Sequence, residues 1–534
     1  MAADGSPFAP LRHRLFAWLW VTNAVSALGA FIQSTATAWV MTDLAPDPLM
    51  VSLVQAASQL PFLLLALPAG ALADIVDRQR YLIATNTSML AVAGALAVLY
   101  ALGMVTAWAL LGLTALLAAL TALNSPALAS SVPATVPRHD LQQALVLNSI
   151  GYNIARALGP GICGVIVASL GAAAAFATNA ACFAIVAVVT ATTLALPRSA
   201  GVSGIPPERL TRATRQGVRY AMAEPAVRAT LIRSAAFYAF AGAIWALLPL
   251  YVREVLDLSS AGYGLMLGAI GAGAVLGGIL MPRLRDRVSR DGFVLLAGLM
   301  TGGALIPLAL MPSPGAAVVA MLIYGMGWIV GASNLQATVQ LASAPWVRAR
   351  GLAIYQAVLN GGLGLGAVAW GWLGQHLGLT GTLLVAGLGG IAMTWVSKWV
   401  TLPEEVLDPS LTAERPPPRV QVHKSVSPEL ETRRTPVLVT IAYHVDPAET
   451  PAFRAAMAEL SAARRRDGAV AWMLARDVER PEAWVEAFRL PDWHELRRGV
   501  ARLNLTDSMA VEKAKSFHRG AGPPEVRVLL AEAW

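Results

Sequence analysis

Long apolar runs, separated by short polar or charged connections, fill the chain up to residue 403. A helix that spans a membrane needs about 20 mostly apolar residues, and each run meets that length. Pro, Gly or charged residues bound the runs, as is typical of connections between helices. The pattern therefore predicts twelve spans, at 15–42, 49–73, 82–103, 106–127, 142–169, 172–195, 230–256, 261–281, 292–311, 315–341, 351–376 and 379–400.

The composition supports a membrane protein. Of the 534 residues, 56% are hydrophobic and 13% are charged, whereas an ordinary soluble domain carries about 25% charged residues. The mean hydropathy is +0.57. An ordinary water-soluble fold of this length is thereby excluded.

Arginines occupy every second connection between the predicted spans. They lie at Arg12 and Arg14, at Arg78 and Arg80, at Arg138, within 198–228, within 283–290, and at Arg348 and Arg350. The other connections hold almost no basic residue, with Arg253 as the exception. By the positive-inside rule, both termini are cytoplasmic and the chain is a multi-pass protein of the cell inner membrane. The net charge of +8 follows from this topology and does not indicate a nucleic-acid partner.

The spans fall into two halves. The Pro-, Gly- and Arg-rich segment 198–228 is a predicted cytoplasmic linker between six-helix bundles at 1–197 and 229–403. Shifting the sequence by 208 residues places Gly70 on Gly278, and the glycine-rich fifth span on the eleventh. A weak repeat of six spans is typical of transporters with a central site between two bundles.

The composition changes sharply after the last span. Residues 404–434 are polar and Pro-rich, which predicts a linker. Alternating and helical patterns in 435–534 follow the order βαββαβ, which predicts a soluble α+β domain of the ferredoxin-like, dimeric αβ-barrel type. We expect an all-α polytopic fold of twelve helices with this domain attached.

The short connection "GALADIVDRQR" packs charge between the second and third spans. Arg78 and Arg80 can reach the free carbonyls at the end of the preceding helix, and Asp77 can sit at the positive start of the next. Asp74 can pair with a loop arginine, and Gly70 allows close helix approach. The segment is either an electrostatic latch or an ordinary charged cytoplasmic loop.

This segment resembles the signature loop of the major facilitator superfamily, and residues 48–82 are similar to its enterobactin-exporter-like branch. The resemblance implies two six-helix bundles that alternate between inward- and outward-open states. It also implies that Asp74 and Arg78 lock the halves in the outward-open state. Pro282 replaces the acidic residue in the second copy of the loop. The soluble tail resembles the extension found on some members of this branch.

The fifth span, "GYNIARALGPGICG", resembles the Gly-Pro motif of the exporters in this superfamily. Its small or kinking residues are Gly151, Gly159, Pro160 and Gly164. Small residues allow tight helix packing, and proline removes a backbone hydrogen bond. The resemblance implies export, although helix packing alone can also explain the composition.

Arg156 is the most distinctive residue of the candidate site. An arginine at the centre of a membrane helix costs at least about 2.5–3.5 kcal/mol, so it should face the interior or a watery cavity. With Asn153 one turn away, it is predicted to attract an anion or gate the central path. A structural arginine held by backbone carbonyls is the alternative.

Acidic residues are rare in the spans. Asp43, at the end of the first span, is the first candidate for proton coupling and Glu254 the second, although Asp43 could also be a solvated helix-end residue. Other polar and aromatic residues suit a pocket for a bulky, partly aromatic solute, or else join helices through hydrogen bonds. These predicted path residues are Gln33, Gln59, Tyr238, Trp245, Gln356 and Asn360.

These observations predict a secondary transporter that exports a small organic solute, siderophore-like or drug-like, by proton antiport. No phosphate-binding loop or catalytic motif is found in the sequence, so neither an ATP-driven pump nor an enzyme is expected. No metal or cofactor is expected, because the histidines of the tail lack ligand spacing. A transporter-derived sensor, or a membrane-anchored enzyme acting through the tail, remains the alternative. The tail could also form a homodimer.

Overall fold

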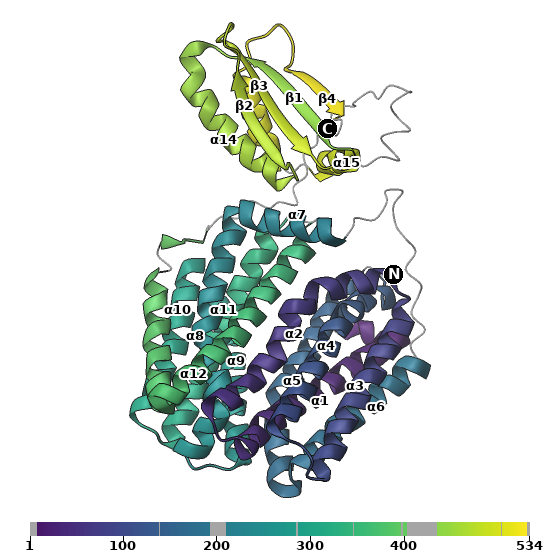
Figure 1. The fold of residues 1–534 in the computed structure, drawn as a ribbon, viewed down its shortest axis with the longest axis vertical. Helices are drawn as coiled ribbons and strands as arrows, with labels where there is room; N and C mark the ends of the chain where they lie inside the picture. The colour runs from purple at the N-terminus through teal and green to yellow at the C-terminus, as the bar shows by residue number, and fades with distance from the viewer. Residues whose placement is uncertain are drawn as a thin grey trace. The chain divides into compact units, whose positions relative to one another are not determined.

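A computed structural model describes residues 8–137, 139–192, 210–284, 287–344, 347–396, 399–402, 435–502 and 505–530 (Figure 1). The predicted linker 404–434 and the start of the linker 198–228 lie outside these residues. The chain divides into two compact units. The first consists of residues 1–202, 231–335 and 355–402, and the second of residues 203–230, 336–354 and 403–534.

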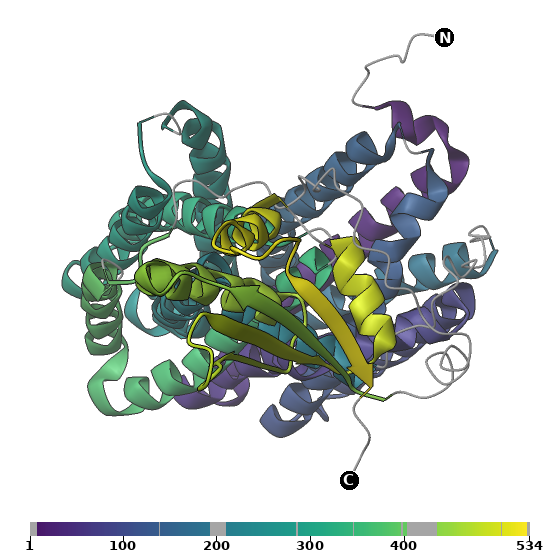
Figure 2. The ribbon, with the colours of Figure 1, turned by 90° about the horizontal axis from the view of Figure 1, so that it is seen from above.

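Two helical bundles make up most of the first unit, and Figures 1 and 2 both show them side by side. The first bundle follows a short 3₁₀ turn (Ala9–Arg12) and consists of α1 (Arg14–Leu44), α2 (Pro48–Ile75), α3 (Arg78–Ala101), α4 (Ala107–Thr135), α5 (Leu141–Leu170) and α6 (Ala172–Thr192). The second consists of α8 (Pro225–Leu250) with a π-helical turn (Tyr251–Val255), α9 (Ser260–Leu284), α10 (Arg290–Leu310), α11 (Pro314–Ala342) and α12 (Arg348–Val396).

Eleven helices within the described ranges are long and apolar enough to cross a membrane. The chain is therefore a mostly helical, multi-pass membrane protein, as its hydrophobic pattern predicts. The helix α12 differs from the others because it contains 49 residues and is interrupted at Gly378, where φ is 70° and ψ is 171°. A helix of that length would extend about 74 Å, more than twice the hydrocarbon thickness of about 30 Å. The interruption falls between the predicted spans 351–376 and 379–400.

Buried amides join the helices of the first bundle. Asn124 on α4 donates to Asn86 on α3 at 3.1 Å, and Asn86 donates to Thr190 on α6 at 3.3 Å. Because an amide in lipid has no water to bind, these partners favour one register of the three helices.

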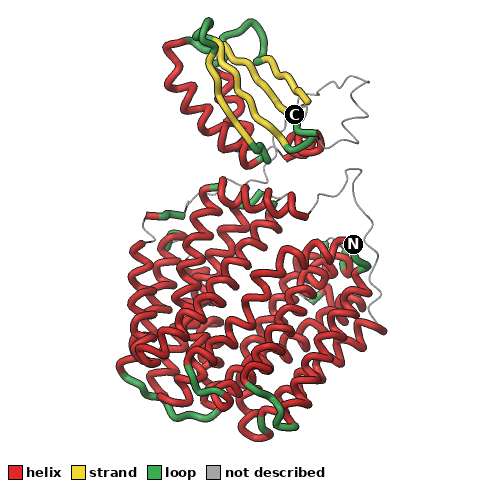
Figure 3. The backbone as a smooth tube through the Cα atoms, viewed as in Figure 1, coloured by secondary structure: helices red, strands yellow, loops and turns green. Residues whose placement is uncertain are grey.

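The second unit contains α7 (Leu210–Ala223) and a small α+β domain (Figure 3). The domain runs β1 (Val437–His444), a 3₁₀ turn (Pro447–Glu449), α14 (Thr450–Arg466), β2 (Ala471–Arg476), β3 (Ala483–Leu490), α15 (Trp493–Arg502), α16 (Leu505–Ser516) and β4 (Glu525–Leu530). The sheet is antiparallel in the order β2-β3-β1-β4. The predicted βαββαβ order is present, with two helices in the second helical region.

One face of the sheet packs against the helices. Alternate residues of β1 are buried, and they form a core with Phe453, Met457 and Leu460 of α14. The opposite face exposes apolar side chains, among them Met473 and Leu529. Successive residues of each strand therefore point alternately to the helix-covered face and to the exposed face of the sheet.

A carboxylate lies inside this core. The side chain of Glu486 is fully buried, and it accepts hydrogen bonds from Trp472 Nε1 at 3.0 Å, Arg464 Nε at 3.1 Å and Tyr443 OH at 3.3 Å. Burial, together with the neighbouring Glu486 carboxylate, raises the pKa of Tyr443 above its ordinary value. Glu486 thus satisfies three buried donors at once.

We expect Glu486→Ala to destabilise the domain by about 3–5 kcal/mol, because removing one partner of a buried ion pair leaves the other charge uncompensated. Hydrogen exchange of the β1 and β3 amides in the intact protein measures the loss. Glu459→Ala is the control, since Glu459 pairs with Lys513 on the surface and such pairs contribute up to about 1 kcal/mol. Equal effects of the two substitutions would contradict the assignment.

Candidate functional site

The two bundles meet where α1 ends and α2 begins, which we call the α1–α2 end. Arg253, in the turn after α8, forms an ion pair with Asp43 at the end of α1. Its Nη1 donates to Thr42 Oγ1 at 2.9 Å, and its guanidinium lies 5.7 Å from the centroid of the Trp39 ring. Arg253, which is the exception to the alternating pattern of arginines in the connections, therefore joins the two bundles.

Helices α2 and α12 also meet at this end. Asp47, the N-cap of α2, accepts a hydrogen bond from Gln375 Nε2 on α12 at 2.7 Å. A Cβ atom added to Gly374 would lie 2.8 Å from Pro48 Cβ, which is closer than side chains tolerate. The absence of a side chain at Gly374 therefore lets α2 and α12 touch.

Helices α5 and α9 form the third contact. A Cβ atom on Gly164 would lie 2.9 Å from the carbonyl oxygen of Ser260 and 3.2 Å from Gly264 Cα. A Cβ atom on Gly264 would lie 2.9 Å from the carbonyl oxygen of Pro160. The two backbones are in direct contact, because glycine occupies both sides of the crossing.

The other glycines of the fifth-span motif face α1 within the first bundle. A Cβ atom on Gly151 would lie 3.2 Å from Trp20 Nε1, and one on Gly159 would lie 2.6 Å from Phe31 Cβ. Pro160 lies inside α5. The motif therefore divides its contacts between the neighbouring helix and the opposite bundle.

Arg156 lies on α5 between these glycines and is half-buried. The charge of Arg156 has an electrostatic effect on the phenol groups of Tyr238 on α8 and Tyr324 on α11, and this effect is smaller than that of their burial. A cation of the first bundle therefore lies near polar aromatic groups of the second.

These tyrosines belong to an aromatic cluster that consists of Tyr238, Trp245, Tyr324, Trp328 and Tyr355. Trp328 lies at its centre, 5.4 Å from Tyr238, 5.6 Å from Trp245 and 6.2 Å from Tyr324 between ring centroids. The hydroxyls of Tyr238 and Tyr355 share a hydrogen bond of 2.7 Å, and Tyr324 donates to the carbonyl of Ala241 at 2.6 Å. The cluster packs rings and hydroxyl groups of α8, α11 and α12 against one another, and Tyr238, Tyr324, Trp328 and Tyr355 are all buried.

The remaining predicted path residues have different surroundings. Gln33 is buried on α1 and accepts from Asn179 of α6 at 2.5 Å, which places it inside the first bundle. Asn153 and Asn360 each donate to a carbonyl of their own helix, at 2.8 Å and 2.6 Å. Gln356 is exposed on α12, and Gln59 packs against Gly364 across the bundle contact.

The charged connection between α2 and α3 is partly described. Asp77 is the N-cap of α3 and accepts from the backbone N–H of Arg80 at 3.0 Å. Arg78 donates through Nη1 to the carbonyl of Ser130 on α4 at 3.1 Å, and Arg80 is exposed. The side-chain surroundings of Gly70 and Asp74 lie outside the described part, so the proposed latch of Asp74 stays a prediction.

The two candidate acids both lie at the α1–α2 end. The Asp43 side chain is 46% exposed and pairs with Arg253, whereas Glu254 is exposed in the same turn as Arg253. Within the described residues, no group of three His, Cys, Asp or Glu side chains could hold a metal ion.

Sequence reasoning missed Arg253, Trp39, Tyr324 and Trp328. Arg253 could have been selected from the sequence, because it breaks the alternation between connections that carry arginines and connections that do not. Tyr324 and Trp328 stand four residues apart in "YGMGW", a spacing that places two aromatic rings on one face of a helix.

Two bundles of membrane-spanning helices, with a cation and an aromatic cluster near their contact, form an arrangement typical of transporters of small molecules. The family model described as "Transmembrane secretion effector" matches residues 5–533. The chain belongs to this family, within the major facilitator superfamily.

One curated relative is the staphyloferrin A transporter of Staphylococcus aureus (strain NCTC 8325 / PS 47). It is 26% identical over 282 residues, which are 52% of this chain and 70% of the relative.

Solved structures show the same fold at low identity. A bacterial homologue of the human lysosomal transporter Spinster, inward-facing and unoccupied, is 14% identical with a TM-score of 0.59 over 74% of this chain and 98% of that chain. The peptide transporter POT in complex with sulfate is 14% identical with a TM-score of 0.61 over 75% and 95%. A nucleoside transporter is 13% identical with a TM-score of 0.58 over 72% and 99%.

Proposed function

We propose that this protein exports a small, anionic, partly aromatic organic solute by alternating access. The observation that carries the proposal is Arg156 of the first bundle, close to the phenols of Tyr238 and Tyr324 in the second. A guanidinium binds a carboxylate or catecholate oxygen, and aromatic rings pack against a planar cargo. Because these groups come from both bundles, their separation changes when the bundles rock.

The proposed topology has twelve spans, with α12 divided at Gly378 and both termini in the cytoplasm. The α1–α2 end then faces the outside of the inner membrane. The contacts at this end, Asp43 with Arg253 and Gly164 with Gly264, support an inward-open state. Alternating access requires that these contacts break while the opposite end closes.

Export is favoured over uptake by two observations. The fifth span carries the Gly-Pro motif that resembles the exporters of the superfamily, and the family is described as a secretion effector. The named cargo of the Staphylococcus aureus relative suggests a siderophore or a solute of similar chemistry.

Asp43 is the residue to which we assign proton coupling in the proposed antiport. Protonation of Asp43 removes the charge that pairs with Arg253, which releases the contact between the bundles. We expect Asp43→Asn to make export in inverted vesicles insensitive to an imposed pH gradient. Asp47→Asn is the control, because Asp47 accepts a hydrogen bond from an uncharged amide. Undiminished dependence on the gradient in Asp43→Asn would assign proton coupling elsewhere.

Comparison of organic anions inside cells that lack the gene, and in cells complemented with it, tests the function. We expect a carboxylate- or catechol-bearing solute to accumulate only in cells without the protein. An unchanged content of such solutes under conditions in which the gene is expressed would contradict export.

A regulatory role of the soluble domain is the second candidate, because α7 contacts two parts of the second unit. Tyr220 of α7 accepts from the N–H of Ala344 at 3.1 Å and donates to the carbonyl of Ala342 at 3.2 Å, in the α11–α12 connection. On the domain side, Arg466 pairs with Glu224, which follows α7, at 3.5 Å. The helix α7 can therefore transmit movement between the connection and the domain.

We expect the protein to export its cargo after removal of residues 404–534, but at a rate that differs from the wild type by a few-fold. The single substitution Tyr220→Phe should reproduce that change, because it removes the donor to Ala342 without changing the ring. Transport assays in vesicles measure both. Complete loss of export in the well-folded truncated protein would favour a direct role of the domain.

The exposed face of the sheet with Met473 and Leu529 is the proposed homodimer surface. The mass of the purified protein in detergent tests whether the protein is a dimer.

A further inference from the structure

An aromatic ring of the first bundle is accessible, whereas most of the aromatic cluster of the second bundle is not. The buried members of that cluster are Tyr238, Tyr324, Trp328 and Tyr355. Its fifth member, Trp245, is partly exposed. Tyr152 on α5, by contrast, is 54% exposed. A planar solute can therefore contact the Tyr152 ring without displacing packed side chains.

Other helices occupy two sides of α5. Gly151 and Gly159 face α1. Ala157 faces α9, because a Cβ atom on Gly271 would lie 3.4 Å from the Ala157 Cα. Successive residues of a helix lie about 100° apart around its axis. The contacts with α1 and α9 therefore leave two separate sides of α5 uncovered.

These two uncovered sides differ in polarity. One exposes the apolar side chains of Ile154, Leu158 and Val165, as is typical of a surface in contact with lipid. The other carries Tyr152 and Arg156, which lie one turn apart and about 40° apart around the axis. An arginine within a membrane helix faces the protein interior or a watery cavity. Tyr152 therefore shares the side of α5 that faces the proposed cargo path.

Phe31 of α1 holds the Tyr152 ring in place. The two ring centroids lie 5.5 Å apart with an angle of 62° between the planes, which is an edge-to-face contact. A Cβ atom on Gly159 would lie 2.6 Å from Phe31 Cβ, so the absence of a side chain at Gly159 lets Phe31 approach α5. The Tyr152 ring is thus positioned before cargo arrives, and much of its surface stays accessible.

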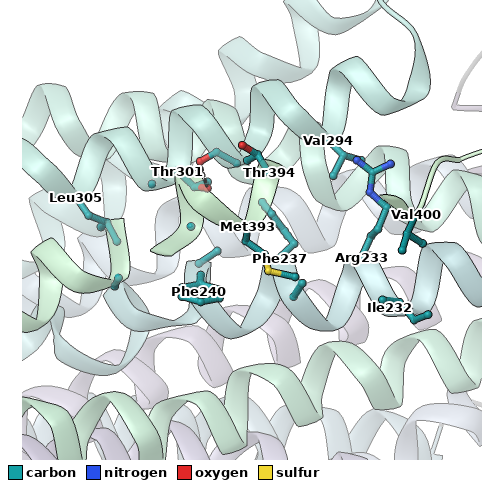
Figure 4. A pocket seen from close by; sticks show the side chains of 16 residues that line it. Ile232, Arg233, Phe237, Phe240, Val294, Thr301, Leu305, Met393, Thr394 and Val400 are labelled. Atoms are coloured by element: carbon teal, nitrogen blue, oxygen red, sulfur yellow. Dashed lines mark hydrogen bonds between the residues drawn. The ribbon is translucent and has the colours of Figure 1, made fainter. Parts of the chain in front are cut away.

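A second set of rings lines a groove between α8, α10 and the second part of α12, but this groove is too small for the cargo. Phe237 and Phe240 line it, and Figure 4 shows Arg233 toward one end and Leu305 at the other. Its volume is about 50 Å³, whereas pockets for organic ligands measure about 300 Å³ or more. These rings therefore serve packing within the second bundle.

We propose that Tyr152 gives the transporter its preference for aromatic over aliphatic anions, by stacking on the planar part of the cargo while Arg156 binds the anionic group. This inference rests on the proposed function, because it concerns recognition at the same site. One helical turn, about 6 Å along the axis, separates the two residues. A single cargo molecule with an anionic group on its ring can therefore contact both.

Calorimetry of the full-length protein in detergent tests this role, with naphthoate and its saturated analogue decahydronaphthoate as probes. The two anions share a carboxylate and a carbon skeleton, but only naphthoate is aromatic. We expect the wild type to bind naphthoate about five-fold more tightly, because a contact between aromatic rings adds roughly a factor of 2 to 12 beyond apolar burial. Tyr152→Leu should remove this preference by weakening naphthoate alone, and Tyr152→Phe should keep it.

Two further variants separate the possible outcomes. Leu158→Ala alters the apolar side of α5 and should keep the preference, whereas Arg156→Ala should weaken both anions roughly 30-fold. A wild type without preference, an unchanged preference in Tyr152→Leu, or equal weakening of both anions by Tyr152→Leu would each overturn the role of Tyr152 and leave the proposed function standing. A wild type that binds neither anion would overturn the proposed function and this inference with it.

Discussion

We expect Arg156→Ala to reduce export of an anionic cargo by roughly 30-fold or more while the protein stays folded. Removing one partner of a desolvated charge pair costs about 2–5 kcal/mol, and each 1.4 kcal/mol corresponds to about a factor of ten. Arg156 is the charge that lies near the aromatic cluster, so its loss should weaken cargo binding directly. Binding of organic anions to the purified protein, followed by calorimetry, measures the effect.

Two controls separate charge from stability. Arg228→Ala removes an exposed arginine at the start of α8 and should leave binding unchanged. Tyr238→Phe keeps the ring and removes one hydroxyl, so it should weaken binding less than Arg156→Ala. If Arg156→Ala binds anions as tightly as the wild type, Arg156 is a structural residue and the proposed site is wrong.

Gly164→Leu should prevent the α1–α2 end from closing. A leucine cannot fit against the Ser260 carbonyl and Gly264 at the present distances of 2.9 and 3.2 Å. Overpacking of this kind costs about 1–3 kcal/mol, which shifts a two-state equilibrium by roughly 5- to 150-fold. Distances between spin labels on α5 and α9 measure the change in population.

Gly161→Leu is the matched control for this prediction. Gly161 lies on the same helix, and a Cβ atom there would meet nothing within 4 Å. We expect Gly161→Leu to keep the wild-type distribution of distances. A Gly164→Leu protein with that same distribution would show that the α5–α9 contact does not set the conformational equilibrium.

The spans and the sheet could be predicted because each depends on local pattern. Apolar runs of spanning length fixed the helices, and even the interruption at Gly378 falls in the predicted gap between 376 and 379. Alternation in 435–534 predicted the strands of the sheet and the hairpin of β2 with β3.

The site was harder to predict because its contacts join residues far apart in the chain. The pairing of Asp43 with Arg253 spans more than 200 positions, and no local pattern links them. Gln33 illustrates the opposite difficulty, since a polar residue in a span can serve a cavity or a neighbouring helix. Its bond with Asn179 is internal to the first bundle, and only the fold reveals that partner.

Transport into inverted membrane vesicles tests the proposed function most directly. The anion to use is the one that accumulates in cells lacking the gene. We expect the wild type to show uptake into these vesicles driven by a proton gradient, and Arg156→Ala to reduce that uptake at least roughly 30-fold. Equal uptake with both proteins, or none with either, would contradict a central path that recognises anions through Arg156.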